Sequence, residues 1–176
     1  MIKKIVCGGQ TGVDRAGLDA AIKFNIPHGG WCPSGRLAED GKIAEKYLLQ
    51  ETVSSDYSER TKLNIKDSDG TLILVSEIPI KVTDGTLLTM EEAKNTGKPS
   101  LIVDLSQPPD ISSLLAWIEK NNIQTLNIGG PRESQSPGIY QKSLKFLEAV
   151  FPLLNCQDCC LVSKDGEEAN SSVLRQ

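Results

Sequence analysis

The stretch Thr71-Leu72-Ile73-Leu74-Val75 decides the fold class of this 176-residue chain. It is aliphatic at four successive positions, so both of its faces are suited to burial, as in a strand of a parallel sheet that helices cover on both sides. Short runs rich in β-branched and aliphatic residues predict further strands over 2–7, 101–103 and 125–128.

Segments between these runs carry the spacing of amphipathic helices. The clearest stripe is Ile111, Leu114, Leu115 and Ile118, at positions i, i+3, i+4 and i+7. Further helices are expected over 14–25, 57–65, 84–97 and 137–154, with Ser55 or Asp56 and Asp84 as candidate caps. Alternation of strands and helices predicts one three-layer α/β domain over 1–154 with a mostly parallel sheet. The polar, aperiodic residues 155–176 are expected to form a tail.

Composition excludes several classes of protein. The chain has 39% hydrophobic and 24% charged residues and a net charge of −4, which is typical of a soluble globular protein and argues against nucleic-acid binding. It has no apolar run near the roughly 20 residues that span a bilayer, so we expect a cytoplasmic protein with no membrane contact. Five cysteines and a single histidine predict neither a disulfide framework nor a zinc site, and the purpose of Cys156, Cys159 and Cys160 stays open.

Two glycine-rich segments follow predicted strands, where parallel sheets bind their ligands. Gly8-Gly9-Gln10-Thr11-Gly12-Val13-Asp14-Arg15 leads into a helix and is neither a Walker A loop nor a dinucleotide fingerprint. Its glycines and the free N–H groups of a helix start favour an anion, with a tight turn as the alternative. Residues 129–138 contain three glycines, two prolines and an Arg-Glu-Ser set, which favours a ligand loop over a structural turn.

Arginines reinforce this hypothesis, since a guanidinium is suited to phosphate or carboxylate. Arg15, Arg36, Arg60 and Arg132 lie in or beside the loop-rich segments, and scattered surface ion pairs are the alternative. Thr86 and Thr89 share one face at the start of an expected helix. The expected binding residues are Gly8, Gly9, Gln10, Thr11, Gly12, Arg15, Arg36, Gly85, Thr86, Thr89, Gly130, Arg132, Glu133 and Ser134.

Several of these segments together resemble the molybdenum cofactor carrier family. The resemblance runs from about Ile2 to Leu154 and is carried by 8–15, 30–36, 38–41, 67–71 and 129–134, in that order. The family is more distantly similar to the lonely-guy and lysine-decarboxylase-like proteins, which implies a Rossmann-like fold and a homo-oligomer. Phosphoribohydrolases of that group carry Pro-Gly-Gly-x-Gly-Thr-x-x-Glu. Here Thr89 stands at the position of the catalytic glutamate and the Pro-Gly-Gly is missing, which argues against nucleotide hydrolysis.

The resemblance implies a binding protein that carries a phosphorylated pterin, the molybdenum cofactor, with molybdoenzymes as possible recipients. One alternative is an enzyme that hydrolyses the N-glycosidic bond of a nucleotide, with Glu133 or Glu91 as acid or base. The other is a sensor that binds a nucleotide signal and passes it to a partner protein. No cluster of soft ligands predicts direct contact with a metal, and catalytic residues stay unassigned.

Overall fold

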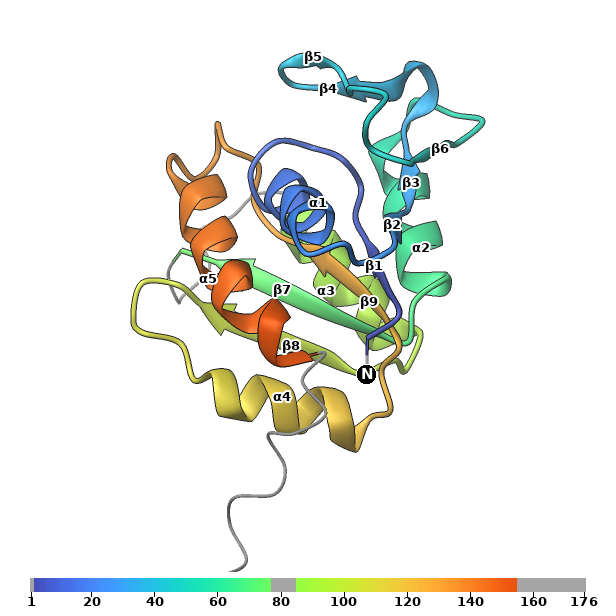
Figure 1. The fold of residues 1–176 in the computed structure, drawn as a ribbon. Helices are drawn as coiled ribbons and strands as arrows, with labels where there is room; N and C mark the ends of the chain where they lie inside the picture. The colour runs from blue at the N-terminus through green and yellow to red at the C-terminus, as the bar shows by residue number, and fades with distance from the viewer. Residues whose placement is uncertain (1, 77–84, 155–176) are drawn as a thin grey trace, which may run out of the picture.

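The computed structural model describes residues 2–76 and 85–154, and these residues form a five-stranded parallel sheet in the order β2-β1-β9-β7-β8 (Figure 1). The strands are β1 Lys4–Val6, β2 His28–Gly29, β7 Gly70–Val75, β8 Ser100–Asp104 and β9 Thr125–Gly129. The most aliphatic strand, β7, is buried at every position and lies inside the sheet between β9 and β8. The parallel sheet predicted from 71–75 is therefore confirmed.

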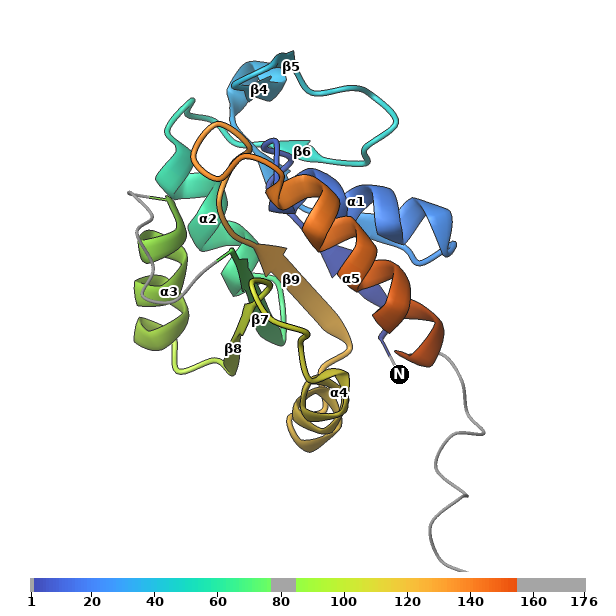
Figure 2. The same ribbon diagram turned by 90° about the vertical axis from the view of Figure 1, so that its left-hand side faces the viewer.

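Helices cover both faces of the sheet (Figure 2). The helices α1 Val13–Lys23, α4 Ile111–Lys120 and α5 Ile139–Leu154 lie on one side, and α2 Tyr57–Lys66 and α3 Gly85–Asn95 lie on the other. Within these two outer layers α1 packs on α5 and α2 packs on α3. The Rossmann-like three-layer sandwich is thus confirmed.

Helix ends follow local chemistry. Asp56, rather than Ser55, caps α2, because its carboxylate accepts a hydrogen bond from the Ser58 amide at 2.8 Å. The last helix begins at Ile139, so the expectation that Pro137 lies in its first turn is wrong: Gly138 has φ +85°, which interrupts a helical path. The proposed cap Asp84 and the expected tail 155–176 lie outside the described residues.

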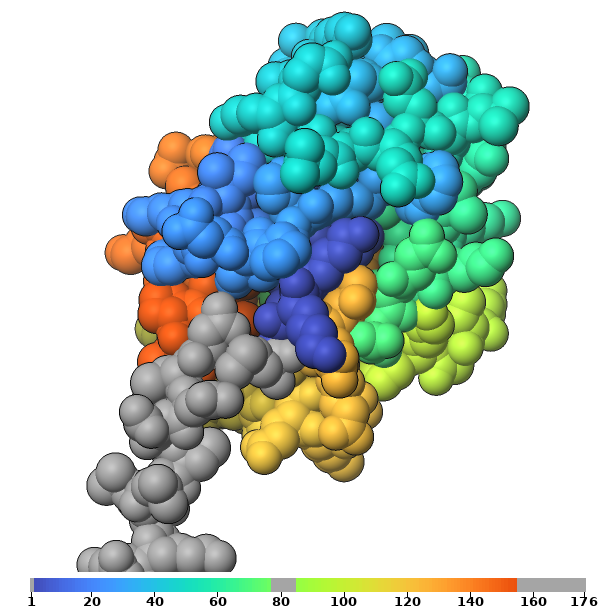
Figure 3. Space-filling view, turned by 45° about the vertical axis from the view of Figure 1, so that its right-hand side comes forward, coloured from blue at the N-terminus to red at the C-terminus, as the bar shows by residue number. Residues whose placement is uncertain are grey.

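An arm of short elements, residues 31–51, projects beyond the carboxyl ends of the strands (Figure 2). Much of it lies at the top of the surface in Figure 3. It comprises β3 Trp31–Cys32, the 3-10 turn Ser34–Arg36, β4 Leu37–Ala38, β5 Gly41–Lys42 and β6 Gln50–Glu51. The side-chain amide of Asn64 on α2 fixes its base, accepting from Trp31 N at 2.7 Å and donating to Trp31 O at 3.0 Å. Sequence reasoning predicted only a loop at 29–35, because two-residue strands leave no periodic pattern.

Candidate functional site

The carboxyl ends of β1, β7 and β9 meet at the point where the chain changes direction across the sheet. From β1 the chain continues through α1 to β2, and from β7 it continues through α3 to β8 on the opposite side. Ligands of open α/β sheets bind in the crevice at such a point. A cavity of ≈ 230 Å³ lies here.

Most residues that line the cavity are polar and come from α1, α2, α3 and the loops after β1 and β9. They are Gln10, Asp14, Tyr57, Arg60, Thr61, Asn64, Gly85, Leu88, Thr89, Asn127, Ile128, Gly129, Gly130, Arg132 and Gln135. The first turn of α3 contributes Gly85 and Leu88, so a helix N-terminus with its positive dipole end borders the cavity. Two arginines and many hydrogen-bonding groups in one concave site suit a small anionic ligand.

A buried ion pair forms part of the wall. Arg60 Nη1 lies 3.1 Å from Oδ2 of Asp14, whose residue is 4% exposed, and the Arg60 side chain is 16% exposed. The backbone N–H of Gln10 also donates to Asp14 Oδ2, at 3.2 Å. Gly8 makes room for the guanidinium, since a Cβ there would lie 1.8 Å from Arg60 Nη1. The space at Gly8 and the hydrogen bond from Gln10 therefore hold the Arg60–Asp14 ion pair in place.

Burial dominates the pKa of Asp14. Removal from water raises the pKa of the Asp14 carboxyl, and the positive charge of Arg60 opposes that rise. Burial and the neighbouring Asp14 also raise the pKa of Cys7 well above its ordinary value. Cys7 and Cys32 are both buried free thiols, and the raised pKa of Cys7 keeps it a protonated packing residue.

Close backbone packing explains two of the glycines beside the cavity. A Cβ on Gly130 would lie 2.3 Å from the Leu74 carbonyl oxygen, and one on Gly12 would lie 2.4 Å from the Pro131 carbonyl oxygen. The same Pro131 carbonyl accepts from the backbone N–H of Val13 at 3.2 Å. The start of α1 is therefore pressed against the loop after β9.

A cluster around Glu39, consisting of Thr11, Glu39, Arg132 and Ser134, joins the arm to both glycine-rich loops. The carboxylate accepts from the Thr11 hydroxyl and from Ser134, whose N and Oγ lie 3.1 and 2.5 Å away. Arg132 Nε lies 3.5 Å from Glu39 Oε2. Although partial burial raises the pKa of Glu39, these hydrogen bonds outweigh it and the pKa falls below its ordinary value. The cluster keeps Arg132 at the rim, where it also lines the cavity.

Five of the fourteen expected binding residues line the cavity: Gln10, Gly85, Thr89, Gly130 and Arg132. The remaining nine are not among its lining residues: Gly8, Gly9, Thr11, Gly12, Arg15, Arg36, Thr86, Glu133 and Ser134. Most of these belong to the same two loops as the lining residues Gln10, Gly130 and Arg132.

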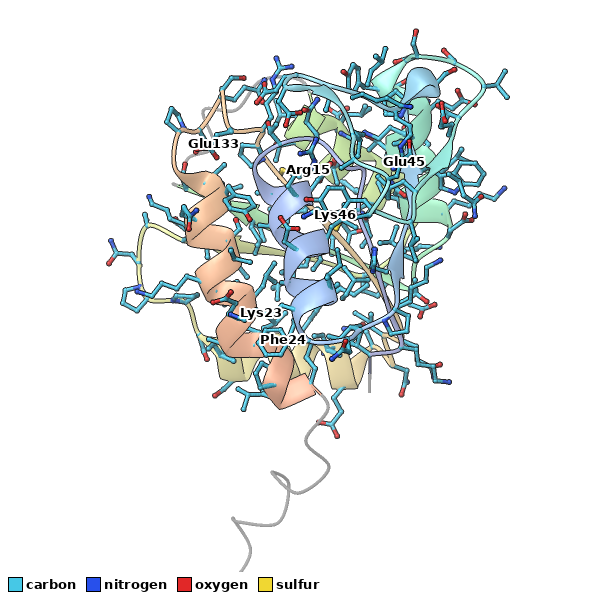
Figure 4. All side chains as sticks on the ribbon, turned by 45° about the horizontal axis from the view of Figure 1, so that its top comes forward. Arg15, Lys23, Phe24, Glu45, Lys46 and Glu133 are labelled. Atoms are coloured by element: carbon cyan, nitrogen blue, oxygen red, sulfur yellow. The ribbon has the colours of Figure 1, made fainter. Side chains whose placement is uncertain are left out.

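Three of these residues are engaged elsewhere. Arg15 projects from α1 to the arm and forms two hydrogen bonds with Asp40 at 3.0 and 3.1 Å (Figure 4). Arg36 is buried in the arm and donates to four backbone carbonyls at 2.9–3.1 Å. Glu133, beside the start of α5 (Figure 4), accepts from the amides of Gly138 and Tyr140 at 2.5 and 3.0 Å. Sequence reasoning recognised their charges but not these internal partners.

Lining residues that the sequence reasoning missed come mainly from α2 and β9, with Asp14 from α1. Asp14 has the pattern of an ordinary first-turn acid, and Arg60, although counted with the loop arginines, was not included among the binding residues. Tyr57, with 41% of its surface exposed, and Asn127 also line the cavity. The signal for Arg60 was its place beside Gly8 in the fold, which no local pattern in the sequence reveals.

Within residues 2–76 and 85–154, no three or more His, Cys, Asp or Glu side chains gather in a way that could hold a metal ion. No helix in the same ranges is long and apolar enough to cross a membrane.

Fold and cavity together define a parallel α/β protein with a cavity of small-ligand size at the carboxyl edge of its sheet. The chain belongs to the circularly permutated YpsA family of SLOG proteins, whose family model matches residues 5–151. It is similar to a protein of Syntrophus aciditrophicus, provisionally named a molybdenum carrier protein, whose crystal structure has 48% sequence identity and a TM-score of 0.77 over 85% of this chain and 94% of that one. No curated protein matches the chain. The family resemblance seen in the sequence is thereby confirmed.

Proposed function

We propose that this protein binds and carries a phosphorylated, flat heterocycle of pterin or nucleotide type, with the molybdenum cofactor as the leading candidate. The observation that carries the proposal is the cavity at the switch point, with Arg60 and Arg132 among its lining residues and the N-terminus of α3 at its border. Guanidinium groups and free helix N–H groups bind phosphate. The exposed ring of Tyr57 offers a stacking surface for a flat ring.

The described residues suit the organic part of that cofactor. Arg132 and the first turn of α3 would hold the phosphate, and Tyr57 would contact the pterin. The name of the Syntrophus aciditrophicus protein supports a carrier role. By the same resemblance we propose that the chain works in the cytoplasm as a homo-oligomer and hands its cargo to molybdoenzymes.

The two glutamates considered as the acid or base of a hydrolase lie outside the cavity. Glu133 accepts hydrogen bonds from two backbone amides beside α5, and Glu91 is an exposed residue of α3. Neither lines the cavity. An acid or base must reach the bond that it cleaves, so these two carboxylates do not support hydrolysis.

Phosphate dependence tests the proposal. Calorimetric titration of the full chain with GMP and with guanosine should show GMP binding at least about tenfold more tightly, since charge-assisted hydrogen bonds to phosphate contribute about 1.5–3 kcal/mol each. Arg132→Gln should weaken GMP about tenfold and leave guanosine unchanged. The control Lys142→Gln, which removes the same charge from an exposed position on α5, should change neither. Equal affinity for GMP and guanosine would contradict a phosphate site.

A further inference from the structure

One carboxylate shares the cavity with the two arginines. Asp14 is the single acid among the described lining residues. A phosphate placed against it would be repelled, whereas the Arg132 guanidinium and the N–H groups at the start of α3 would attract one. The cavity therefore suits a ligand that carries its phosphate at one end and hydrogen-bond donors at the other.

Asp14 is oriented so that one oxygen remains next to the lining residue Gly129. The hydrogen bonds from Gln10 N and Arg60 Nη1 both end on Oδ2. A Cβ built on Gly129 would lie 3.8 Å from Asp14 Oδ1. Neither of the two hydrogen bonds ends on Oδ1, so Oδ1 is the acceptor that Asp14 offers to the cavity that it lines.

Arg60 places a donor beside this acceptor. Its Nη1 is within hydrogen-bonding distance of Asp14, and its Nε is buried and has no hydrogen-bond partner among the described residues. A carboxylate next to a guanidinium is an acceptor–donor pair. It is complementary to a ring edge that carries N–H donors next to a carbonyl oxygen.

Pterins and guanine share such an edge, formed by a 2-amino group, a ring N–H and an oxo group. Oδ1 of Asp14, which neither the Gln10 nor the Arg60 hydrogen bond uses, has two lone pairs and can accept from the amino group and the ring N–H, while the neighbouring guanidinium donates to the oxo group. Adenine instead has an unprotonated ring nitrogen beside its amino group, and that nitrogen would face the carboxylate without a proton between them.

We propose that Asp14, supported by Arg60, recognises the 2-amino-4-oxo edge of the ligand and sets a preference for pterin-type and guanine-type rings over adenine. This inference rests on the proposed function, because it takes the phosphate to lie toward Arg132. It assigns the ring end of the ligand to α1 and α2, and the phosphate end to α3 and the loop after β9.

Three nucleotides that differ only in the base test the inference. GMP carries the full edge, IMP lacks the 2-amino group, and AMP lacks both the oxo group and the ring N–H. Calorimetric titration of the wild-type chain should rank them GMP, IMP, AMP, with GMP at least about tenfold tighter than AMP, as is found for good bidentate base contacts. Equal affinities for GMP and AMP would overturn the inference and leave the proposed phosphate site standing. Lack of binding by all three would overturn the proposed function and the inference with it.

Variants separate recognition from stability. Asp14→Asn should lower the GMP-to-AMP affinity ratio to below about threefold, because the neutral amide loses the negative charge that strengthens hydrogen bonds from the ring edge. Asp40→Asn makes the same chemical change on the arm, outside the cavity lining, and should keep the wild-type ratio. An unchanged ratio in Asp14→Asn would show that Asp14 only braces Arg60. If that variant does not fold, the three-nucleotide comparison on the wild type still decides the matter.

Discussion

Replacing Arg60 with methionine should expose the energetic cost of the buried pair that forms the cavity wall. The substitution keeps much of the side-chain volume but leaves the carboxylate of Asp14 without its cation. Removing one partner of a buried ion pair costs about 3–5 kcal/mol. The Arg60 side chain retains 16% exposure, so we expect the lower end, about 3 kcal/mol, in the free energy of unfolding at pH 7.

The size of this loss should depend on pH. Burial already raises the folded pKa of Asp14, and loss of Arg60 raises it further. The pKa of such a carboxyl group is higher in the folded protein than in the unfolded chain, where it is about 3.9. Its favourable contribution to the free energy of unfolding is fully present below about pH 3.9 and is lost as the pH rises through the folded pKa. The gap between wild type and Arg60→Met should therefore be smallest near the unfolded pKa and widen toward pH 7.

Urea unfolding followed by circular dichroism at several pH values measures both effects. The double variant Asp14→Asn with Arg60→Met removes both charges and should recover most of the lost stability, since uncharged replacements of a buried pair are often neutral. A loss below about 1 kcal/mol at pH 7, a gap that does not change with pH, or a double variant that loses the sum of both single losses would refute the reasoning.

Three further substitutions follow from the structure. Glu39→Gln should lower unfolding stability by about 1–3 kcal/mol in urea titrations, while Asp40→Asn, which loses a half-exposed ion pair, should cost less than about 1 kcal/mol; equal losses would contradict the Glu39 cluster. Gly130→Ala should lower the melting temperature sharply, because its Cβ would meet a backbone carbonyl at 2.3 Å, whereas a Cβ at Gly85 would meet no atom of residues 2–76 or 85–154 within 4 Å, so that Gly85→Ala should melt within a few degrees of wild type. Arg36→Lys should cost about 3 kcal/mol or more, since one ammonium cannot reach the four carbonyls that the guanidinium serves; a loss below that of Asp40→Asn would contradict a structural role.

Much of the fold could be predicted because it depends on local patterns. The aliphatic run of β7 and the apolar stripe of α4 identified a central strand and a covering helix directly. The arm at 31–51 could not be predicted in the same way. Its two-residue strands are held by single contacts from distant residues, such as the Asn64 amide on Trp31.

The sequence predicted the location of the cavity better than it predicted which residues line it. Glycine-rich loops after β1 and β9 marked the edge of the sheet at which the cavity lies, because glycine allows the backbone to approach closely. The charged residues of the site depend on tertiary packing. Arg36 donates inward because its backbone has φ +54° in a tight turn, and Arg60 reaches the cavity only because Gly8 leaves space for it. Such contacts join residues far apart in the chain, and neither composition nor spacing reveals them.

Native mass spectrometry of the full chain, purified gently from its own cells, tests the central proposal most directly when metal analysis is made on the same sample. The cavity residues and the family resemblance predict that the wild-type protein carries the added mass of a phosphorylated pterin, and that its molybdenum content rises in proportion to the pterin-bound fraction. Arg132→Gln should lack this added mass. A co-purified guanine nucleotide without molybdenum would support the proposed ring and phosphate sites but identify a nucleotide, rather than the molybdenum cofactor, as the bound ligand. A chain that carries no phosphorylated heterocycle and binds none when supplied with one would contradict a carrier function.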